Sequence, residues 1–211
     1  MKNRLSLYIA AAFLALAMAP QADAQKPREE GAFENDPVYI VQTLMNNNYM
    51  NMKNLYVPIM NYGGGEKEFN TLLDSYSQGM TLYLHRRMSE AADVFRKNEG
   101  EIRSLAEKIA KKYSEDTRKL HAQTVKMYIR AKIDKSKTDR SVETEISRFT
   151  SGDIYVNNAS DSIRMANRYL ESGRPVDAIV YYRQSKVYCF EAFNTYRVKL
   201  PDGFEIDLAD N

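Results

Sequence analysis

The sequence predicts an all-α protein, a bundle of antiparallel helical hairpins with a long C-terminal helix. Apolar residues recur at spacings of three and four through most of the chain, and no segment shows persuasive strand alternation. Small and aromatic residues in Ala166–Tyr182 indicate two short helices folded against each other around a tight turn. Of the 211 residues, about 187 remain after the signal peptide predicted below, and these suffice for one domain, or two small ones, with a hydrophobic core.

Residues 1–24 predict a signal peptide. Lys2 and Arg4 precede the apolar run Leu5–Ala19, and Ala22-Asp23-Ala24 places small residues where a signal peptidase cleaves. We expect cleavage after Ala24 and a periplasmic protein. We also expect no membrane span in the mature chain, because no later apolar run approaches ~20 residues. An uncleaved N-terminal anchor is the alternative.

The next two segments lead into the fold. Residues 25–36 are polar and predict a disordered leader. Asp36-Pro37 is typical of an N-cap and first helical position, and it predicts a helix across Val38–Met45. A segment rich in Tyr, Met and Asn follows, and Gly63-Gly64-Gly65 predicts a loop. Residues 37–65 are therefore an N-terminal helix and a Tyr/Met/Asn-rich segment.

Residues 66–200 predict a helical hairpin domain. Glu66–Arg96 indicates one hairpin, with Gly79, Leu82, Ala91 and Phe95 at offsets of 0, 3, 12 and 16.

Two apolar stripes after this hairpin predict two further helices, the second starting near Ser114. Ser141–Phe149 then predicts a short helix that Thr150-Ser151-Gly152-Asp153 ends, and Ser160 is expected to cap the next one.

The last helix is predicted from Pro175 to about Leu200. Its apolar seam consists of Ile179, Tyr182, Lys186, Cys189, Phe193 and Tyr196. The aromatics Tyr181 and Tyr188 fall on a neighbouring face, where we expect them to be exposed. Pro201-Asp202-Gly203 stops the helix, and residues 201–211 form an acidic tail.

The hairpin at Ala166–Tyr182 has a spacing of its own. Ala166 and Ala178 allow close helix approach, Tyr169 and Tyr182 fill the adjoining space, and Gly173 can take a left-handed C-cap. This pattern resembles the tetratricopeptide repeat (TPR), a fold of paired helices that mostly binds other proteins. The similar spacing at Gly79–Phe95 is a poorer match, because Arg86 stands where Gly173 stands in the other copy. The two copies lie 87 residues apart, which excludes a regular array.

The sequence predicts no catalytic, cofactor-binding or metal-binding residues. His85 and His121 belong to no ligand spacing, and Cys189 on the apolar seam is expected to be a buried, inert thiol. Asp202, Asp207 and Asp210 lack the order of a calcium loop, so we interpret them as a solvated terminus. We therefore expect a protein that is not an enzyme, although an enzyme stays the third hypothesis.

Charge gives no case for nucleic-acid binding, because 30 basic residues face 28 acidic ones. Basic residues concentrate in two runs, Lys108–Lys119 and Lys132–Arg140. Such runs are usually solvated helix faces. The alternative is a docking face for an acidic partner or an anionic envelope polymer.

Tyrosines mark the candidate protein-binding surface. The segment Tyr49–Tyr62 either packs against the first helices or forms an exposed adhesive surface, since Tyr and Met are enriched at interfaces. The candidates for protein binding are Tyr49, Tyr56, Tyr62, Tyr181 and Tyr188.

A second resemblance is to the spirochaete periplasmic flagellar coiling proteins, which coat the flagellar filament. It rests on the export signal, the all-helical prediction and the Tyr-rich segment Ala178–Tyr196. The resemblance implies a noncatalytic structural protein whose partners are other periplasmic proteins, including flagellar filament subunits, and self-association into a homo-oligomer stays open. The alternative function is a periplasmic TPR-like adaptor that binds a peptide or an envelope enzyme transiently.

Overall fold

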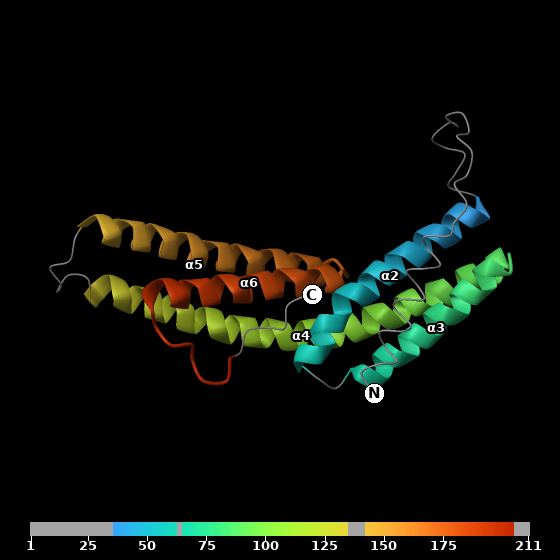
Figure 1. Ribbon diagram of the computed structural model, residues 1–211, viewed down its shortest axis with the longest axis horizontal. Coiled ribbons are helices and arrows are strands. Elements are labelled where there is room, and N and C mark those ends of the chain that lie inside the picture. Colours follow the sequence, from blue (N-terminus) through green and yellow to red (C-terminus); the bar gives the residue numbers. More distant parts are fainter. Residues whose placement is uncertain (1–35, 63–64, 135–141, 205–211) are drawn as a thin grey trace, which may run out of the picture. The chain divides into compact units, whose positions relative to one another are not determined.

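The computed structural model describes residues 36–62, 65–134 and 142–204. Every regular element among them is an α-helix, which confirms the predicted class. The helices are α2 (Pro37–Tyr62), α3 (Glu66–Leu84), α4 (Met88–Asp134), α5 (Val142–Glu171) and α6 (Pro175–Tyr196) (Figure 1). The predicted signal peptide, nearly all of the leader and residues 205–211 of the acidic tail lie outside the described residues.

Helix α4 is a single element of 47 residues, about 70 Å long at 1.5 Å per residue. The prediction of two helices here was wrong, because Ser114 lies inside α4 rather than at a helix start. The two apolar stripes join without a break, since Ile109, Tyr113, Thr117 and Leu120 are all buried at spacings of four, four and three. Because the buried stripe is continuous, a single helix can pack against partner helices along its whole length.

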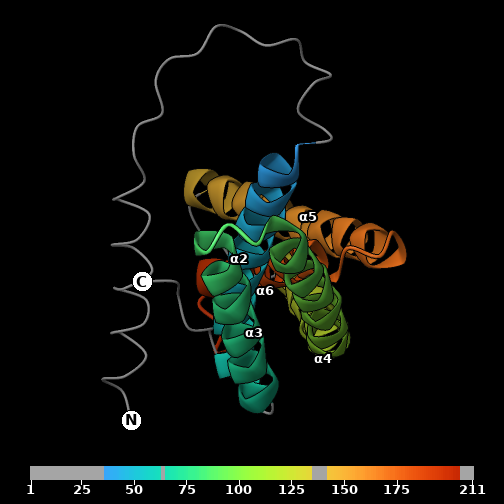
Figure 2. The same cartoon turned by 90° about the vertical axis from the view of Figure 1, so that its right-hand side faces the viewer.

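The other four helices all pack against α4. α2 and α3 lie along its N-terminal part and α5 and α6 along its C-terminal part (Figures 1 and 2). Among the described helices, α2 also contacts α6, whereas α3 contacts neither α5 nor α6. The two pairs are therefore joined mainly through α4.

The main hydrophobic core lies where the two pairs meet on α4. All five helices contribute buried side chains to it, for example Leu55 of α2, Leu72 of α3, Ile102 of α4, Ala166 of α5 and Ile179 of α6. Fully burying a large apolar side chain of this kind stabilises the fold by about 1.5–3 kcal/mol.

Two smaller clusters lie on either side of this core. Val41, Ala91, Ala92 and Phe95 form one near the start of α4, and Leu120, Ala159, Cys189, Phe190 and Phe193 form the other.

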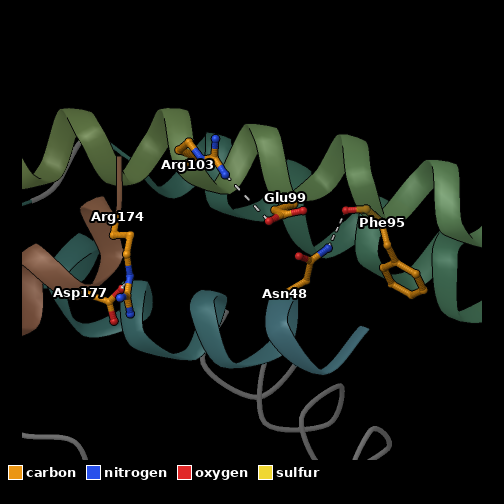
Figure 3. Close-up of polar contacts among 6 residues, drawn as sticks. All are labelled: Asn48, Phe95, Glu99, Arg103, Arg174 and Asp177. Carbon is orange, nitrogen blue, oxygen red and sulfur yellow. Dashed lines mark hydrogen bonds and ion pairs between the residues drawn. The ribbon is translucent and has the colours of Figure 1, made fainter. Parts of the chain in front are cut away.

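Two buried asparagines tie α2 and α3 to α4. Asn48 Nδ2 donates a hydrogen bond of 2.7 Å to the Phe95 carbonyl (Figure 3). Asn98 Nδ2 donates one of 2.9 Å to the Leu72 carbonyl. Each hydrogen bond contributes about 1 kcal/mol net to stability. If α2 or α3 shifted along α4, the bond would be lost while the amide group stayed buried, which would cost free energy. These asparagines therefore select one packing register for the three helices.

The connection between α3 and α4 and the connection between α5 and α6 use the same type of turn. Gly173 has φ +73°, and its N–H bonds to the Leu170 carbonyl at 3.1 Å. Arg86 has φ +60°, and its N–H bonds to the Tyr83 carbonyl at 2.9 Å. The α3–α4 turn therefore has the same geometry with arginine as the α5–α6 turn has with glycine. A non-glycine residue in the left-handed conformation lowers stability by roughly 1 kcal/mol or more.

Helices α2 and α5 run further than the sequence indicated. The helix predicted over Val38–Met45 continues to Tyr62, so the Tyr/Met/Asn-rich segment is helical. The predicted stop at Thr150-Ser151-Gly152-Asp153 was wrong, because α5 passes through it. Gly152 allows close packing instead of ending the helix, since a Cβ there would collide with the Tyr196 hydroxyl.

Two other local predictions need correction. Ser160 does not cap a helix but lies inside α5, where its hydroxyl donates to the Val156 carbonyl at 3.0 Å. Helix α6 ends at Tyr196 rather than near Leu200, since Arg197 adopts φ +54°. The Val198 N–H then bonds back to the Phe193 carbonyl at 3.1 Å, which closes the helix end.

The contact between α3 and α4 at Gly79 gives a testable prediction. A Cβ at Gly79 would lie 2.8 Å from the Phe95 ring, whereas a Cβ at Gly100 would meet nothing within 4 Å. We expect Gly79→Ala to destabilise the protein by about 1–3 kcal/mol through overpacking. Gly100→Ala should instead stabilise it by up to about 1 kcal/mol, because alanine is the better helix former. Urea denaturation of the two variants checks this, and equal stabilities would contradict a close contact between Gly79 and Phe95.

Candidate interaction surface

The junction of α2 and α3 carries a regular row of side chains, most of them aromatic. Residues seven apart on α2 face residues seven apart on the antiparallel α3. We call the six residues of these pairs the α2/α3 seam: Gln42 with Tyr83, Tyr49 with Tyr76, and Tyr56 with Phe69. The Gln42 amide donates to Tyr83 Oη at 2.9 Å, and the Tyr56 and Phe69 ring centroids lie 5.8 Å apart.

The rings of this seam are anchored in the core beneath them. Tyr76 packs on Phe95 of α4 with ring centroids 5.4 Å apart. Burial, with a smaller contribution from Tyr49, raises the pKa of Tyr76 to about 12, so its hydroxyl stays protonated at neutral pH. Tyr49 is the most accessible of the seam tyrosines, with 37% of its surface exposed. The accessible part of the seam is therefore Tyr49 together with the exposed hydrogen bond between Gln42 and Tyr83, whereas Phe69 is buried in the main core.

A second row of tyrosines follows the outer junction of α5 and α6. We call Tyr155, Tyr169, Tyr181 and Tyr188 the α5/α6 seam. Tyr169 and Tyr181 stack with centroids 5.1 Å apart at 16°, and the Tyr155 and Tyr188 centroids lie 6.5 Å apart. The pKa of Tyr181 is raised because its hydroxyl is hydrogen-bonded to Tyr169 in the neutral form, and because two ionised rings at this distance would repel each other. These contacts hold each pair of rings across the junction in one orientation.

Charged groups border the stacked pair at the start of α6. The Arg174 guanidinium lies 4.7 Å from the centroid of the Tyr169 ring. Its Nε also donates to Asp177 Oδ2 at 2.8 Å (Figure 3). A cation over a partly exposed ring contributes about 0.5–1 kcal/mol. This end of the seam therefore offers a partner a guanidinium, a carboxylate and two tyrosine hydroxyls.

The predicted protein-binding residues divide between the two seams. Tyr49 and Tyr56 lie on the α2/α3 seam, and Tyr181 and Tyr188 lie on the α5/α6 seam. The expectation that Tyr181 and Tyr188 are exposed was wrong, because packing against Tyr169 and Tyr155 leaves both half-buried. Tyr62 is the last residue of α2, and its side chain lies outside the described part of the structure.

The packing interpretation of Tyr49–Tyr62 is confirmed for one face of α2, and the adhesive role of the other face stays a prediction. Met52, Leu55 and Ile59 are buried in the main core. Met50 and Met60 are 50% and 49% exposed and lie off this buried face. The segment is thus a packing helix with an accessible Tyr/Met surface.

Three seam tyrosines were not among the predicted residues: Tyr76, Tyr83 and Tyr155. The missing signal was the spacing of seven residues, which Tyr49 and Tyr56 share with Tyr76 and Tyr83. In an antiparallel pair, equal spacing on both helices aligns the side chains rung by rung.

The five residues assigned to hairpin packing lie together at the α5–α6 turn. Ala166 and Ala178 are fully buried, and Gly173 closes the turn. Tyr182 is also fully buried, and its hydroxyl donates to Asn167 Oδ1 at 2.8 Å. Arg118 of α4 donates to the same oxygen at 3.1 Å. Tyr169 differs from Tyr182, since it faces the seam rather than α4.

The histidine and cysteine environments do not resemble an activated nucleophile. His121 Nε2 lies 2.8 Å from Ser160 Oγ, but that hydroxyl donates to the Val156 carbonyl rather than to the imidazole. An activated serine donates to the imidazole instead. Burial raises the pKa of the Cys189 thiol to about 11, which keeps it protonated at neutral pH. His85 is exposed beside the α3–α4 turn.

Metal clusters and membrane-spanning helices are both absent from the described residues. No three or more His, Cys, Asp or Glu side chains within them are grouped so that they could hold a metal ion. None of the described helices is both long enough and apolar enough to cross a membrane.

Comparison with known proteins identifies no relative. No protein-family model, curated protein or solved structure matches the chain. The resemblances to TPR units and to flagellar coiling proteins therefore rest on the residues quoted for them.

The partly buried position of His121 gives a prediction about pH. Burial lowers the pKa of His121, although a bond to the Val156 carbonyl opposes the shift. The folded protein therefore binds this proton less readily than the unfolded chain, whose histidine has a pKa near 6.5. We expect stability to decrease as pH falls below about 6.5, until the lowered folded-state pKa is passed.

Urea denaturation at about pH 7.5 and pH 5 measures this loss. The loss should be smaller in His121→Gln than in the wild type, and His85→Gln, at the exposed histidine, should behave as the wild type does. An unchanged pH dependence in His121→Gln would contradict the assignment.

Proposed function

We propose that this protein is an exported, noncatalytic helical scaffold that binds other proteins of a periplasmic assembly through its tyrosine seams. The observation that carries the proposal is the pair of seams, in which rings pack side by side across each helix junction, with Tyr49 exposed on one seam and the stacked Tyr169–Tyr181 pair partly exposed on the other. Aromatic side chains that are already ordered bind with little loss of conformational entropy, and they dominate interface energies.

The particular assembly we propose is a flagellar filament, with this chain as a sheath or coiling component. The support is the predicted export signal, the Tyr-rich segment Ala178–Tyr196 and the two seams, whose helix pairs both pack against the one long helix α4. A protein that touches its filament at two fixed places along a stiff helix could bind laterally and bias the curvature. Contact with a second copy along the filament fits the same arrangement.

A second candidate is a periplasmic TPR-like adaptor. The supporting observation is the α5–α6 hairpin, in which Ala166 and Ala178 are buried and Gly173 closes the turn. Against it, α4 runs through both halves, so the hairpins are not successive stacked repeats. The abundance of the protein discriminates the two: a filament component should be plentiful and sediment with the assembly, whereas an adaptor should be scarce and remain in the supernatant.

The test of the scaffold proposal uses one alanine substitution in each seam. Tyr56→Ala and Tyr188→Ala should each weaken co-purification with partners from the native envelope. A central aromatic anchor is worth about 2 kcal/mol or more, which corresponds to roughly 30-fold in affinity. Quantitative mass spectrometry of the captured proteins measures the effect.

The matched controls are Lys53→Ala on α2 and Glu191→Ala on α6, two exposed residues each three positions from the tested tyrosine. They should retain the partners. Helix content and urea midpoints of all four variants ensure that lost binding does not reflect unfolding. Wild-type capture by both tyrosine variants would refute the proposal.

A further inference from the structure

The outward face of α4 carries a straight row of basic side chains from near its middle toward its C-terminal end. Lys108, Lys112, Lys119, Lys126 and Arg130 are all exposed, and they follow one another at spacings of four, seven, seven and four. These spacings place them on one stripe of the helix, about 33 Å long. We call these five residues the basic stripe. Glu115 is the one acidic residue within the row.

The basic stripe differs from the rest of α4 in how its charges are compensated. Nearer the N-terminus, basic residues pair with acids on the same helix: Arg96 with Asp93, Lys97 with Glu101, and Arg103 with Glu99. Among the described residues, no member of the basic stripe takes part in an ion pair. The positive charge of this stripe is therefore directed to the solvent, where it can attract a distributed anion.

Exposed isoleucines continue the same row. Ile129 and Ile133 are 49% and 60% exposed, and Ile133 follows Lys126 at the same spacing of seven. Ile154 of α5 is 51% exposed and follows Asp153, whose carboxylate pairs with Lys132 of α4 at 2.9 Å. Ile129 and Ile133 therefore place branched apolar side chains at the C-terminal end of the basic stripe.

We infer that this face of α4 docks on the surface of an anionic lipid bilayer. A straight row of ammonium groups matches a flat layer of phosphate headgroups, and the isoleucines can enter the boundary between headgroups and acyl chains. A soluble polyanion would use the basic stripe but gain nothing from the isoleucines. This surface lies on α4, apart from both tyrosine seams, so the inference does not rest on the proposed function.

The test measures co-sedimentation with vesicles. All described helices lie after residue 36, so a chain that begins at Gln25 contains all of them. It is mixed with vesicles of phosphatidylcholine alone, or with about 30% phosphatidylglycerol added. Binding should require the anionic lipid and should weaken as salt is raised, because salt screens charges at the surface.

Two sets of variants assign this binding to the face of α4. Lys112→Gln, Lys119→Gln and Lys126→Gln together should lower vesicle binding roughly 100-fold, at about fivefold for each charge. The matched control Lys53→Gln, Lys67→Gln and Lys199→Gln changes the net charge equally at exposed lysines elsewhere, and it should bind as the wild type does. Replacing the same three stripe lysines by arginine should preserve binding. Circular dichroism verifies that each variant is folded.

The isoleucines separate a bilayer from a soluble polyanion. Ile129→Ser with Ile133→Ser should weaken binding to anionic vesicles but leave binding to inorganic polyphosphate unchanged. The inference is overturned if neutral and anionic vesicles bind equally, if the two triple glutamine variants bind alike, or if the isoleucine variant binds vesicles as the wild type does. Binding to polyphosphate without binding to vesicles would also overturn it.

Discussion

Packing of four helices against one uninterrupted helix is the constraint on which the rest of the structure depends. The buried stripe of α4 passes from the cluster at Phe95 through the main core to the cluster at Leu120 without a break in the helix. Among the described helices, α3 contacts neither α5 nor α6, so the two helix pairs are joined through α4 and through the α2–α6 contact. A break in α4 would leave the α2–α6 contact as the remaining direct link between them. Polar ties such as the Asn48 amide then fix where each helix sits along α4.

The fold class could be predicted because apolar periodicity is a local property of the chain. The α5–α6 turn could also be predicted, because Gly173 adopts the left-handed conformation and Pro175 is the first residue of α6. Helix boundaries were harder, since they depend on partners distant in sequence. Gly152 looks like a stop signal until Tyr196 is placed against it. Ser114 looks like a helix start until the residues on either side of it are seen to share one buried stripe.

The candidate surface was only partly predictable for a related reason. Composition pointed to tyrosine, and four of the five named tyrosines lie on a seam. Which tyrosines face each other depends on the antiparallel register of two helices, and composition does not contain that register. The same limitation made Tyr181 and Tyr188 seem exposed, since Tyr169 and Tyr155 come from another helix.

The continuity of α4 has a mechanical consequence. An α-helix resists stretching far more than a loop does, because each residue along it is held by a backbone hydrogen bond. A force applied at the α2–α3 pair would reach the α5–α6 pair along a single strut of 47 residues, with no intervening turn to absorb it. Two objects held at opposite ends of this strut would be kept at a set separation and would bend or twist together.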